Sequence, residues 1–241
     1  MKKYLSWPTL RLVLILGLVC FLYSFMTKRN DNRKLKEIKV EFLGNDQLFM
    51  THETVNKLLI ENNEVASSIG KVTLDLNDLE NTIQKHEMVD EVEVFLSIDG
   101  TLKAIVKQKT PVARVYGQDE SYYVDIKGAK MPLSDIYTAR VPLVSGEIKA
   151  EYSEKLEELF RIIHEDDFLK KNIIGIQVLP NGSLKMKNRN YDYDIEFGRT
   201  INMEQKFKNY KAFLQKAVLD SSLYKYKKID LRFTKQVVCT K

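Results

Sequence analysis

An uncharged apolar segment near the amino terminus constrains this 241-residue chain more than any other feature. The run Leu12–Thr27 carries no charged side chain. A helix needs about 20 mostly apolar residues to cross a bilayer, and Trp7 stands where an interfacial aromatic residue would lie. The sequence therefore predicts one membrane helix over residues 12–28, after a short tail of residues 1–11.

A cleaved signal peptide is the main alternative for this segment, because Lys2 and Lys3 would supply its basic start. Cleavage needs small residues in an A-x-A-like pattern, and there is no alanine before Ala66. The stretch Leu18-Val19-Cys20 also lacks the small residue that precedes the cysteine of a lipoprotein signal. An uncleaved anchor fits the sequence better.

The charge distribution also favours a membrane protein. The whole chain carries a net charge of +5, of which residues 1–36 contribute +7 and the remainder −2. A nucleic-acid-binding protein concentrates its basic residues on a folded domain, whereas here they bracket the apolar segment. Because basic residues flank both ends of that segment, the charge count does not predict which end lies in the cytoplasm.

Residues 36–110 show the pattern of a first folded unit. Ile38–Phe42 alternates as a strand, and Thr51 can cap a helix that runs to about Asn62. Asn77, with Glu80 three residues later, is typical of a capping box and predicts a second helix.

A β-hairpin closes this unit. Strands are predicted on both sides of Asp99-Gly100, a turn for which glycine supplies the positive φ. The alternating apolar residues are Val92, Val94 and Leu96 on the first strand and Leu102, Ala104 and Val106 on the second. Pro111 cannot donate to a sheet, so it should end this strand or lie at an edge.

Residues 111–241 predict a second, mixed unit with two helices, over Ser153–His164 and Met203–Leu219. Polar turns are expected in Tyr123–Gly128 and at Pro180-Asn181-Gly182. Strands are predicted around Ile174–Val178, Leu184–Met186, Tyr191–Phe197 and Ile229–Val238.

The side chains that carry chemistry do not form a recognisable catalytic or metal-binding motif. The three histidines, His52, His86 and His164, are far apart in the sequence, and Cys20 and Cys239 fall in the apolar segment and the terminal tail. The acidic stretch His164–Asp167 could weakly hold a cation, but it is rather expected to end a helix. Several basic residues lie near aromatic ones, which leaves nucleic-acid binding open as an interpretation. We favour the other interpretation, in which alternating lysines protect exposed strands from aggregation. The basic residues are Lys185, Lys187, Arg189, Lys225, Lys227 and Lys228.

Three motifs resemble the FtsQ/DivIB family of bacterial cell-division proteins. The first is the hairpin that leads into Pro111-Val112-Ala113, and the second is the turn Asp125–Gly128 followed by Val141–Gly146. The third and most specific is Ile229-Asp230-Leu231-Arg232-Phe233, which is similar to the family's terminal "hydrophobic-Asp-Leu-Arg-aromatic" strand. The chain departs from the family in its very short tail and in its end three residues after Val238.

The resemblance implies an α+β protein with a single N-terminal transmembrane helix. A POTRA domain (β-α-α-β-β) over residues 36–110 and an FtsQ-type mixed β domain over residues 111–241 would follow it. It also implies a single-pass protein of the cytoplasmic (inner) membrane at the division septum. Its N-terminus would lie inside the cell and its domains outside, in the periplasm.

The function implied is that of a non-catalytic bitopic scaffold of the divisome. It would bind small bitopic coiled-coil division proteins (FtsB/FtsL or DivIC-like) and, through them, the septal peptidoglycan synthase. No cofactor, metal or nucleic acid is expected. Two alternatives are a membrane-anchored cell-wall enzyme and a POTRA-type envelope assembly factor, the second of which would need a barrel of strands after the POTRA domain.

The resemblance and the strand pattern together place the partner interface on the terminal strand Ile229–Val238. If Ile229, Leu231 and Phe233 face the core, the next side chain, Arg232, is exposed, and a last strand often lies at a sheet edge. The interface is therefore predicted at Arg232, Phe233, Lys235, Gln236 and Val237. The open alternative is that Asp230 and Arg232 pair internally while Phe233 packs in the core.

Overall fold

The structure is a computed structural model that describes residues 7–31, 37–44, 49–61, 75–117, 120–219 and 223–241. Contacts within the chain divide it into two units, which separate between Gln108 and Lys109. The first unit holds Met1–Asp46 and Met50–Gln108, and the second holds Gln47–Phe49 and Lys109–Lys241. Parts of the predictions fall on residues 1–6 and on Asn62, which lie outside the described residues.

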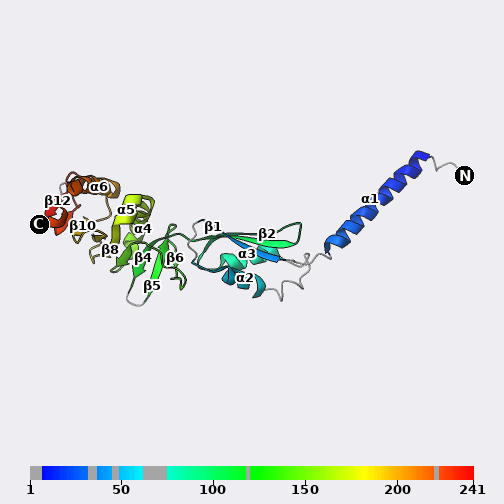
Figure 1. Cartoon of the computed structure of the whole chain (residues 1–241), viewed down its shortest axis with the longest axis horizontal. Coiled ribbons are helices and arrows are strands. Elements are labelled where there is room, and N and C mark those ends of the chain that lie inside the picture. The colour runs from blue at the N-terminus through cyan, green and yellow to red at the C-terminus, as the bar shows by residue number, and fades with distance from the viewer. Residues whose placement is uncertain (1–6, 32–36, 45–48, 62–74, 118–119, 220–222) are drawn as a thin grey trace. The chain divides into compact units, whose positions relative to one another are not determined.

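Helix α1 (Trp7–Asp31) contains the apolar segment (Figure 1). It begins five residues before the predicted start, because Pro8 is tolerated in the first turn of a helix. By length and composition, the 22 residues Trp7–Lys28 can cross a membrane, and their apolar side chains are exposed. The helix is therefore consistent with a membrane anchor.

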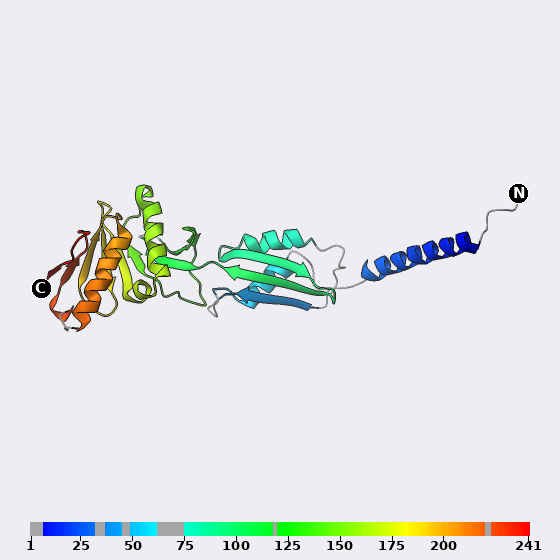
Figure 2. The same cartoon turned by 90° about the horizontal axis from the view of Figure 1, so that it is seen from above.

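The described elements of the first unit follow the order β-α-α-β-β (Figure 2). They are β1 (Glu37–Leu43), α2 (His52–Glu61), α3 (Leu76–Gln84), β2 (Val89–Leu96) and β3 (Thr101–Gln108). β3 lies between β1, which runs parallel to it, and β2, which runs antiparallel. The α+β order that the sequence predicts for this unit is confirmed.

The hairpin of β2 and β3 has the predicted register and turn. Val92 pairs with Val106 and Val94 with Ala104, and Gly100 has a φ of +93°. The buried side chains of the two helices complete the core; they are Val55, Leu59, Leu79 and Ile83. Alternation with a period of two therefore identified the core face correctly.

The cap of α3 differs from the prediction. Asp75 is the N-cap, and its carboxylate accepts hydrogen bonds from the backbone N–H groups of Asn77 and Asp78 at 3.0 and 3.2 Å. Glu80 does not close a capping box and instead accepts a bond from the Val94 N–H at 2.7 Å. A carboxylate is favoured at the positive end of the helix, and α3 here begins two residues earlier than a cap at Asn77 would have placed it.

The second unit is built on a nine-stranded mixed sheet. Its strands are β4 (Pro111–Tyr116), β5 (Ser121–Asp125), β6 (Lys130–Met131), β7 (Leu143–Ser145), β8 (Ile173–Val178), β9 (Leu184–Asn188), β10 (Asp194–Gly198), β11 (Lys228–Asp230) and β12 (Val238–Thr240). In the sheet they follow the order β12-β11-β10-β9-β8-β7-β4-β5-β6.

Three helices and a short 3-10 turn accompany this sheet: α4 (Ala150–Glu165), α5 (Asp167–Asn172), α6 (Met203–Leu219) and η2 (Leu223–Lys225). The helices share one core with alternate strand residues such as Ile176, Met186 and Ile195. On the other face of the sheet, Lys185 and Lys228 pair with Glu196 at 3.3 and 3.2 Å. One face is therefore covered by helices, while charged side chains occupy the other over β9–β11.

Two apolar residues of the predicted strand Ile174–Val178 and the predicted helix Met203–Leu219 are exposed, although their spacing fits the buried face. A β-bulge in β8 turns Ile174 outward to 38% exposure, while Ile173 and Ile176 enter the core. On α6, Val218 is 53% exposed because Ala217 takes the buried position instead. The predicted bounds of α6 are confirmed.

Helix α5 was not predicted, because its six residues are too few to show a helical period. Asp166 caps it, accepting bonds from the Phe168 and Leu169 N–H groups, and also pairs with Lys211 of α6. The acidic stretch after α4 therefore starts a new helix rather than merely ending the previous one.

Candidate partner-binding surface at the carboxyl-terminal hairpin

The last residues of the chain form a hairpin at one end of the nine-stranded sheet. β11 lies parallel to β10, and β12 folds back antiparallel to β11, with Ile229 opposite Cys239. No described strand pairs with the outer side of β12. The prediction of one continuous strand over Ile229–Val238 is therefore wrong, whereas the terminal strand does lie at a sheet edge.

The turn between the two strands is set by Asp230, whose side chain is mostly buried. Its carboxylate accepts bonds from the backbone N–H and the Nε of Arg232, both at 3.0 Å, while the Leu231 N–H donates to the carbonyl of Glu196. A carboxylate bonded to the backbone two residues later redirects the chain as an Asx turn. The strand consequently stops at Asp230, although the apolar alternation continues.

The Asp230–Arg232 ion pair was the open alternative at the sequence level, and it is present. The hydrogen bond from the guanidinium lowers the pKa of Asp230 below its ordinary value of 3.8, against burial, which raises it. Bonding to Asp230 also raises the pKa of Arg232. Phe233, by contrast, is 49% exposed and does not belong to the core.

Gly198 and Lys206 support this turn from the neighbouring strand and helix. Gly198 has a φ of +73°, and a Cβ there would stand 2.7 Å from the Cγ of Arg232, so the glycine makes room for the arginine stem. The buried amine of Lys206 donates to the carbonyls of Phe197 and Arg199 at 2.9 and 2.7 Å, and burial lowers its pKa. The amine thus joins α6 to the end of β10.

The five predicted interface residues lie in the loop between β11 and β12 rather than on a strand. Arg232, Phe233, Lys235 and Gln236 are exposed, and Val237 is partly buried against the core. The loop is held to α6 by Asn209, whose side-chain amide donates to the carbonyl of Thr234 at 2.8 Å. The hairpin thus places these residues at one end of β12.

The sequence reasoning placed the terminal strand at a sheet edge but did not identify Val238–Thr240 (β12) as that strand. The Thr240 carbonyl accepts from the Lys227 N–H at 2.9 Å, so the backbone groups of Thr240 face β11. Because these groups alternate along a strand, the N–H and C=O of Cys239 point to the open edge. Cys239, which the sequence assigned to a tail, packs its side chain against the core, and burial raises its pKa.

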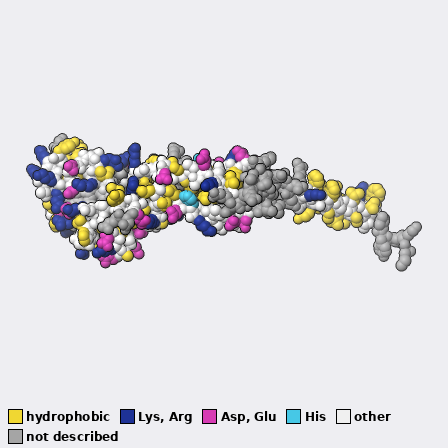
Figure 3. All heavy atoms as spheres, turned by 90° about the horizontal axis from the view of Figure 1, so that it is seen from below, with side chains coloured by type: hydrophobic (Ala, Val, Ile, Leu, Met, Phe, Trp, Pro, Cys, Tyr) yellow, Lys and Arg dark blue, Asp and Glu magenta, His cyan; other side chains and the backbone are white. Residues whose placement is uncertain are grey.

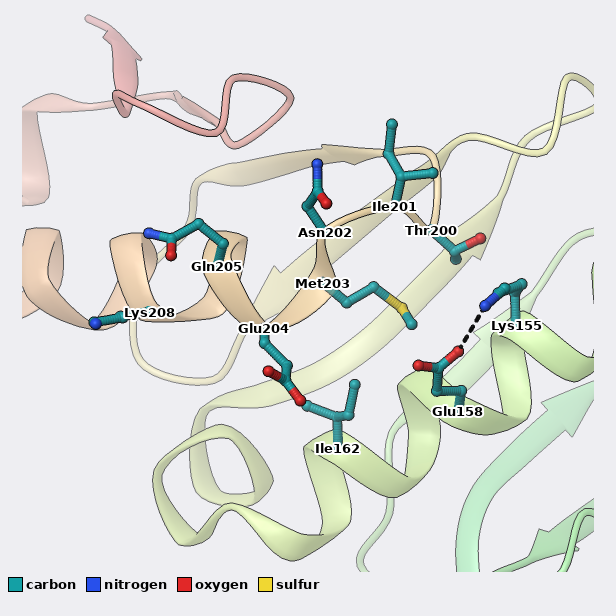
Figure 4. A pocket seen from close by; sticks show the side chains of 10 residues that line it. All are labelled: Lys155, Glu158, Ile162, Thr200, Ile201, Asn202, Met203, Glu204, Gln205 and Lys208. Carbon is teal, nitrogen blue, oxygen red and sulfur yellow. Dashed lines mark hydrogen bonds and ion pairs between the residues drawn. The ribbon is translucent and has the colours of Figure 1, made fainter.

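A groove with a volume of about 680 Å³ lies between α4 and the start of α6 (Figure 4). Glu158 and Glu204 are the acidic residues in its lining, and Glu158 pairs with Lys155 at 3.0 Å. In the described part of the chain, no three His, Cys, Asp or Glu side chains gather as a metal site would require. The histidines lie at the start of α2, after α3 and near the end of α4.

Comparisons with known proteins fit this architecture. The family profile described as "FtsQ/DivIB, C-terminal related" matches residues 110–240, which is more than half of the chain. The chain therefore belongs to the FtsQ/DivIB family of cell-division proteins.

A solved structure titled as the major extracytoplasmic domain of the trans isomer of the cell-division protein DivIB, from Geobacillus stearothermophilus, is similar at 13% identity and a TM-score of 0.33. The similarity covers 47% of this chain and 95% of that one. No curated protein matches the chain. The family assignment therefore rests on the profile.

The geometry of the turn predicts a pH-dependent stability effect. Because the folded-state pKa of Asp230 is lowered, its contribution is present above about pH 3.8 and is lost as the pH falls through the folded value. Asp230→Asn should cost about 1.5 kcal/mol at neutral pH, since a hydrogen-bonded ion pair is lost. Thermal unfolding of the detergent-solubilised chain, followed by circular dichroism from pH 7 to pH 3, measures this effect.

Asp194→Asn is the matched control, because Asp194 pairs with Lys187 but its side chain is 44% exposed. A surface pair of this kind contributes little, so this variant should stay close to wild type. Equal losses at the two positions, or a loss at Asp230 that does not change with pH, would contradict the account of the turn.

Proposed function

We propose that this chain is a non-catalytic, bitopic scaffold of the bacterial divisome. Helix α1 anchors it in the cytoplasmic membrane at the septum, with the N-terminus inside. The second unit binds small bitopic coiled-coil division proteins (FtsB/FtsL or DivIC-like) and connects them to the septal peptidoglycan synthase. Within this proposal, residues 1–11 are the cytoplasmic tail, 12–28 the membrane helix, 36–110 a POTRA domain and 111–241 the FtsQ-type β domain.

The observation that carries the proposal is the open edge of β12 in a chain of this family. A strand at a sheet edge presents N–H and C=O groups to which an extended segment of another protein can pair. The outward N–H and C=O of Cys239 are the centre of this edge. Pairing of this kind needs no catalytic group, which agrees with the separated histidines and with the ion-paired Glu158.

Side chains around the edge have to contribute most of the affinity. Each backbone hydrogen bond adds a net gain of about 1 kcal/mol. A three-residue strand forms few such bonds, so its backbone contributes only a small part of the binding free energy. A micromolar complex needs about 8 kcal/mol. We therefore assign partner contacts to the loop beside β12, where burial of the exposed half of Phe233 alone can add about 1 kcal/mol. The contact residues are Arg232, Phe233, Lys235, Gln236 and Val237.

The orientation part of the proposal is tested in intact cells. Protease added to spheroplasts should digest residues 36–241 and leave only a short anchored fragment. Complete protection of those residues, with a periplasmic marker digested in the same sample, would place the units in the cytoplasm and contradict the proposal.

The edge is tested by a proline that removes one outward hydrogen-bond donor. Cys239→Pro deletes an N–H that points away from β11, so the hairpin should still form, as prolines are tolerated on edge strands. Binding of the coiled-coil partners to the full chain in detergent should weaken at least about tenfold, because the ring also blocks close approach of a strand.

Cys239→Val is the matched control, since it also removes the thiol but keeps the backbone N–H. It should bind like wild type. If the proline and valine variants fold and bind equally well, the partners do not pair with β12.

A further inference from the structure

The terminal hairpin carries an excess of positive charge that the chain itself does not neutralise. From Leu223 to the end there are six Lys and Arg residues and one acidic residue, Asp230. Asp230 is paired with Arg232, and Lys228 is paired with Glu196. Among the described residues, no carboxylate pairs with the exposed Lys225, Lys227 or Lys235.

These unpaired lysines stand at both ends of the edge strand. Lys227 is placed beside the end of β12 by its N–H, which donates to the Thr240 carbonyl, and Lys225 is two residues away. Lys235 lies in the loop that enters β12, and this loop is fixed to α6 through Asn209 and Thr234. Figure 3 shows Lys and Arg side chains gathered over the end of this unit. A strand laid along β12 would therefore have cations near both of its ends.

The backbone of an edge strand accepts almost any sequence, so discrimination has to come from side chains. Positive charges at the edge repel a lysine-rich strand and attract carboxylates, and the lysines beside β12 would also repel the same lysines of a second copy. Each exposed pair contributes about 0.5 kcal/mol. Two or three such pairs together favour an acidic strand about tenfold over a neutral one.

We infer that the segment that pairs with β12 is an acidic strand in which apolar residues alternate with Asp or Glu. Its carboxylates reach Lys225 and Lys227 at one end of β12 and Lys235 at the other. Its apolar side chains lie beside Val238 and Phe233, which are 39% and 49% exposed. This inference rests on the proposed edge-strand function and adds the chemistry of the partner to it.

The test uses the full chain in detergent and labelled nine-residue peptides in which valine alternates with glutamate, glutamine or lysine. Fluorescence anisotropy should show about tenfold tighter binding of the Val/Glu peptide than of the Val/Gln peptide at low salt, and no binding of the Val/Lys peptide. The preference should shrink as salt is added. A peptide of the same composition with its glutamates in one block should bind weakly, because it cannot alternate along a strand.

The lysines are tested by the triple variant Lys225→Gln, Lys227→Gln and Lys235→Gln. It should bind the Val/Glu and Val/Gln peptides equally. The matched control, Lys149→Gln, Lys170→Gln and Lys171→Gln, changes three exposed lysines around α4 and α5 and should keep the wild-type preference.

The peptide-binding results can overturn the acidic preference without overturning the proposed edge-strand function. Equal binding of Val/Glu and Val/Gln peptides to the wild type, abolished by Cys239→Pro, would overturn the acidic preference but leave the edge in place. Tight binding of the block peptide, or Val/Glu binding that survives Cys239→Pro, would show a general polyanion surface and overturn the inference as well. Failure of every peptide, together with coiled-coil partner binding that Cys239→Pro does not change, would refute both.

Discussion

The bond between the Asp230 carboxylate and the Arg232 backbone decides the direction of the last residues of the chain. At 3.0 Å it ends β11 after three residues and starts the loop that returns as β12. Without this turn, the apolar alternation from Ile229 onward would favour one longer strand, and a different set of backbone groups would form the edge. The shape of the open edge therefore depends on a single side chain that is largely shielded from water.

The surroundings of this turn protect an open sheet edge from unwanted pairing. β12 has only three residues, and the loop before it carries charge, two features by which proteins prevent unwanted pairing of edge strands. Gly198 and Lys206 fix the neighbouring end of β10 from the other side. A short and cationic edge can bind only weakly through its backbone, so a partner of the kind proposed above would need matching side chains.

The sequence was sufficient for those elements whose pattern has one interpretation. The hairpin of β2 and β3 and the helix α6 were predictable because apolar periodicity and a turn glycine agree there. The pattern was not sufficient where a side chain competes with the backbone. At Asp230 a carboxylate stops a strand although alternation continues, and at Asp75 a stronger cap displaces the predicted one.

The candidate site also combines features that the sequence predicted with features that it could not predict. The motif Ile229–Phe233 pointed to the end of the chain that holds the open edge, but the edge strand lies beyond this motif and includes Cys239, whose position depends on pairing with Ile229. Lys206 could not have been assigned to the interior, because a buried amine depends on two carbonyls that only the fold brings together. Contacts between residues distant in sequence, rather than propensity, decide these positions.

Hydrogen–deuterium exchange at single amides, in the full chain with and without its coiled-coil partners, tests the central claim most directly. The amide of Cys239 points to the open edge and should exchange fast in the free chain, whereas the partner should protect it at least about tenfold, as a new backbone hydrogen bond requires. The Val238 and Thr240 amides, which face β11, should change much less. Protection confined to another surface, such as the groove between α4 and α6, with Cys239 unchanged, would contradict the account.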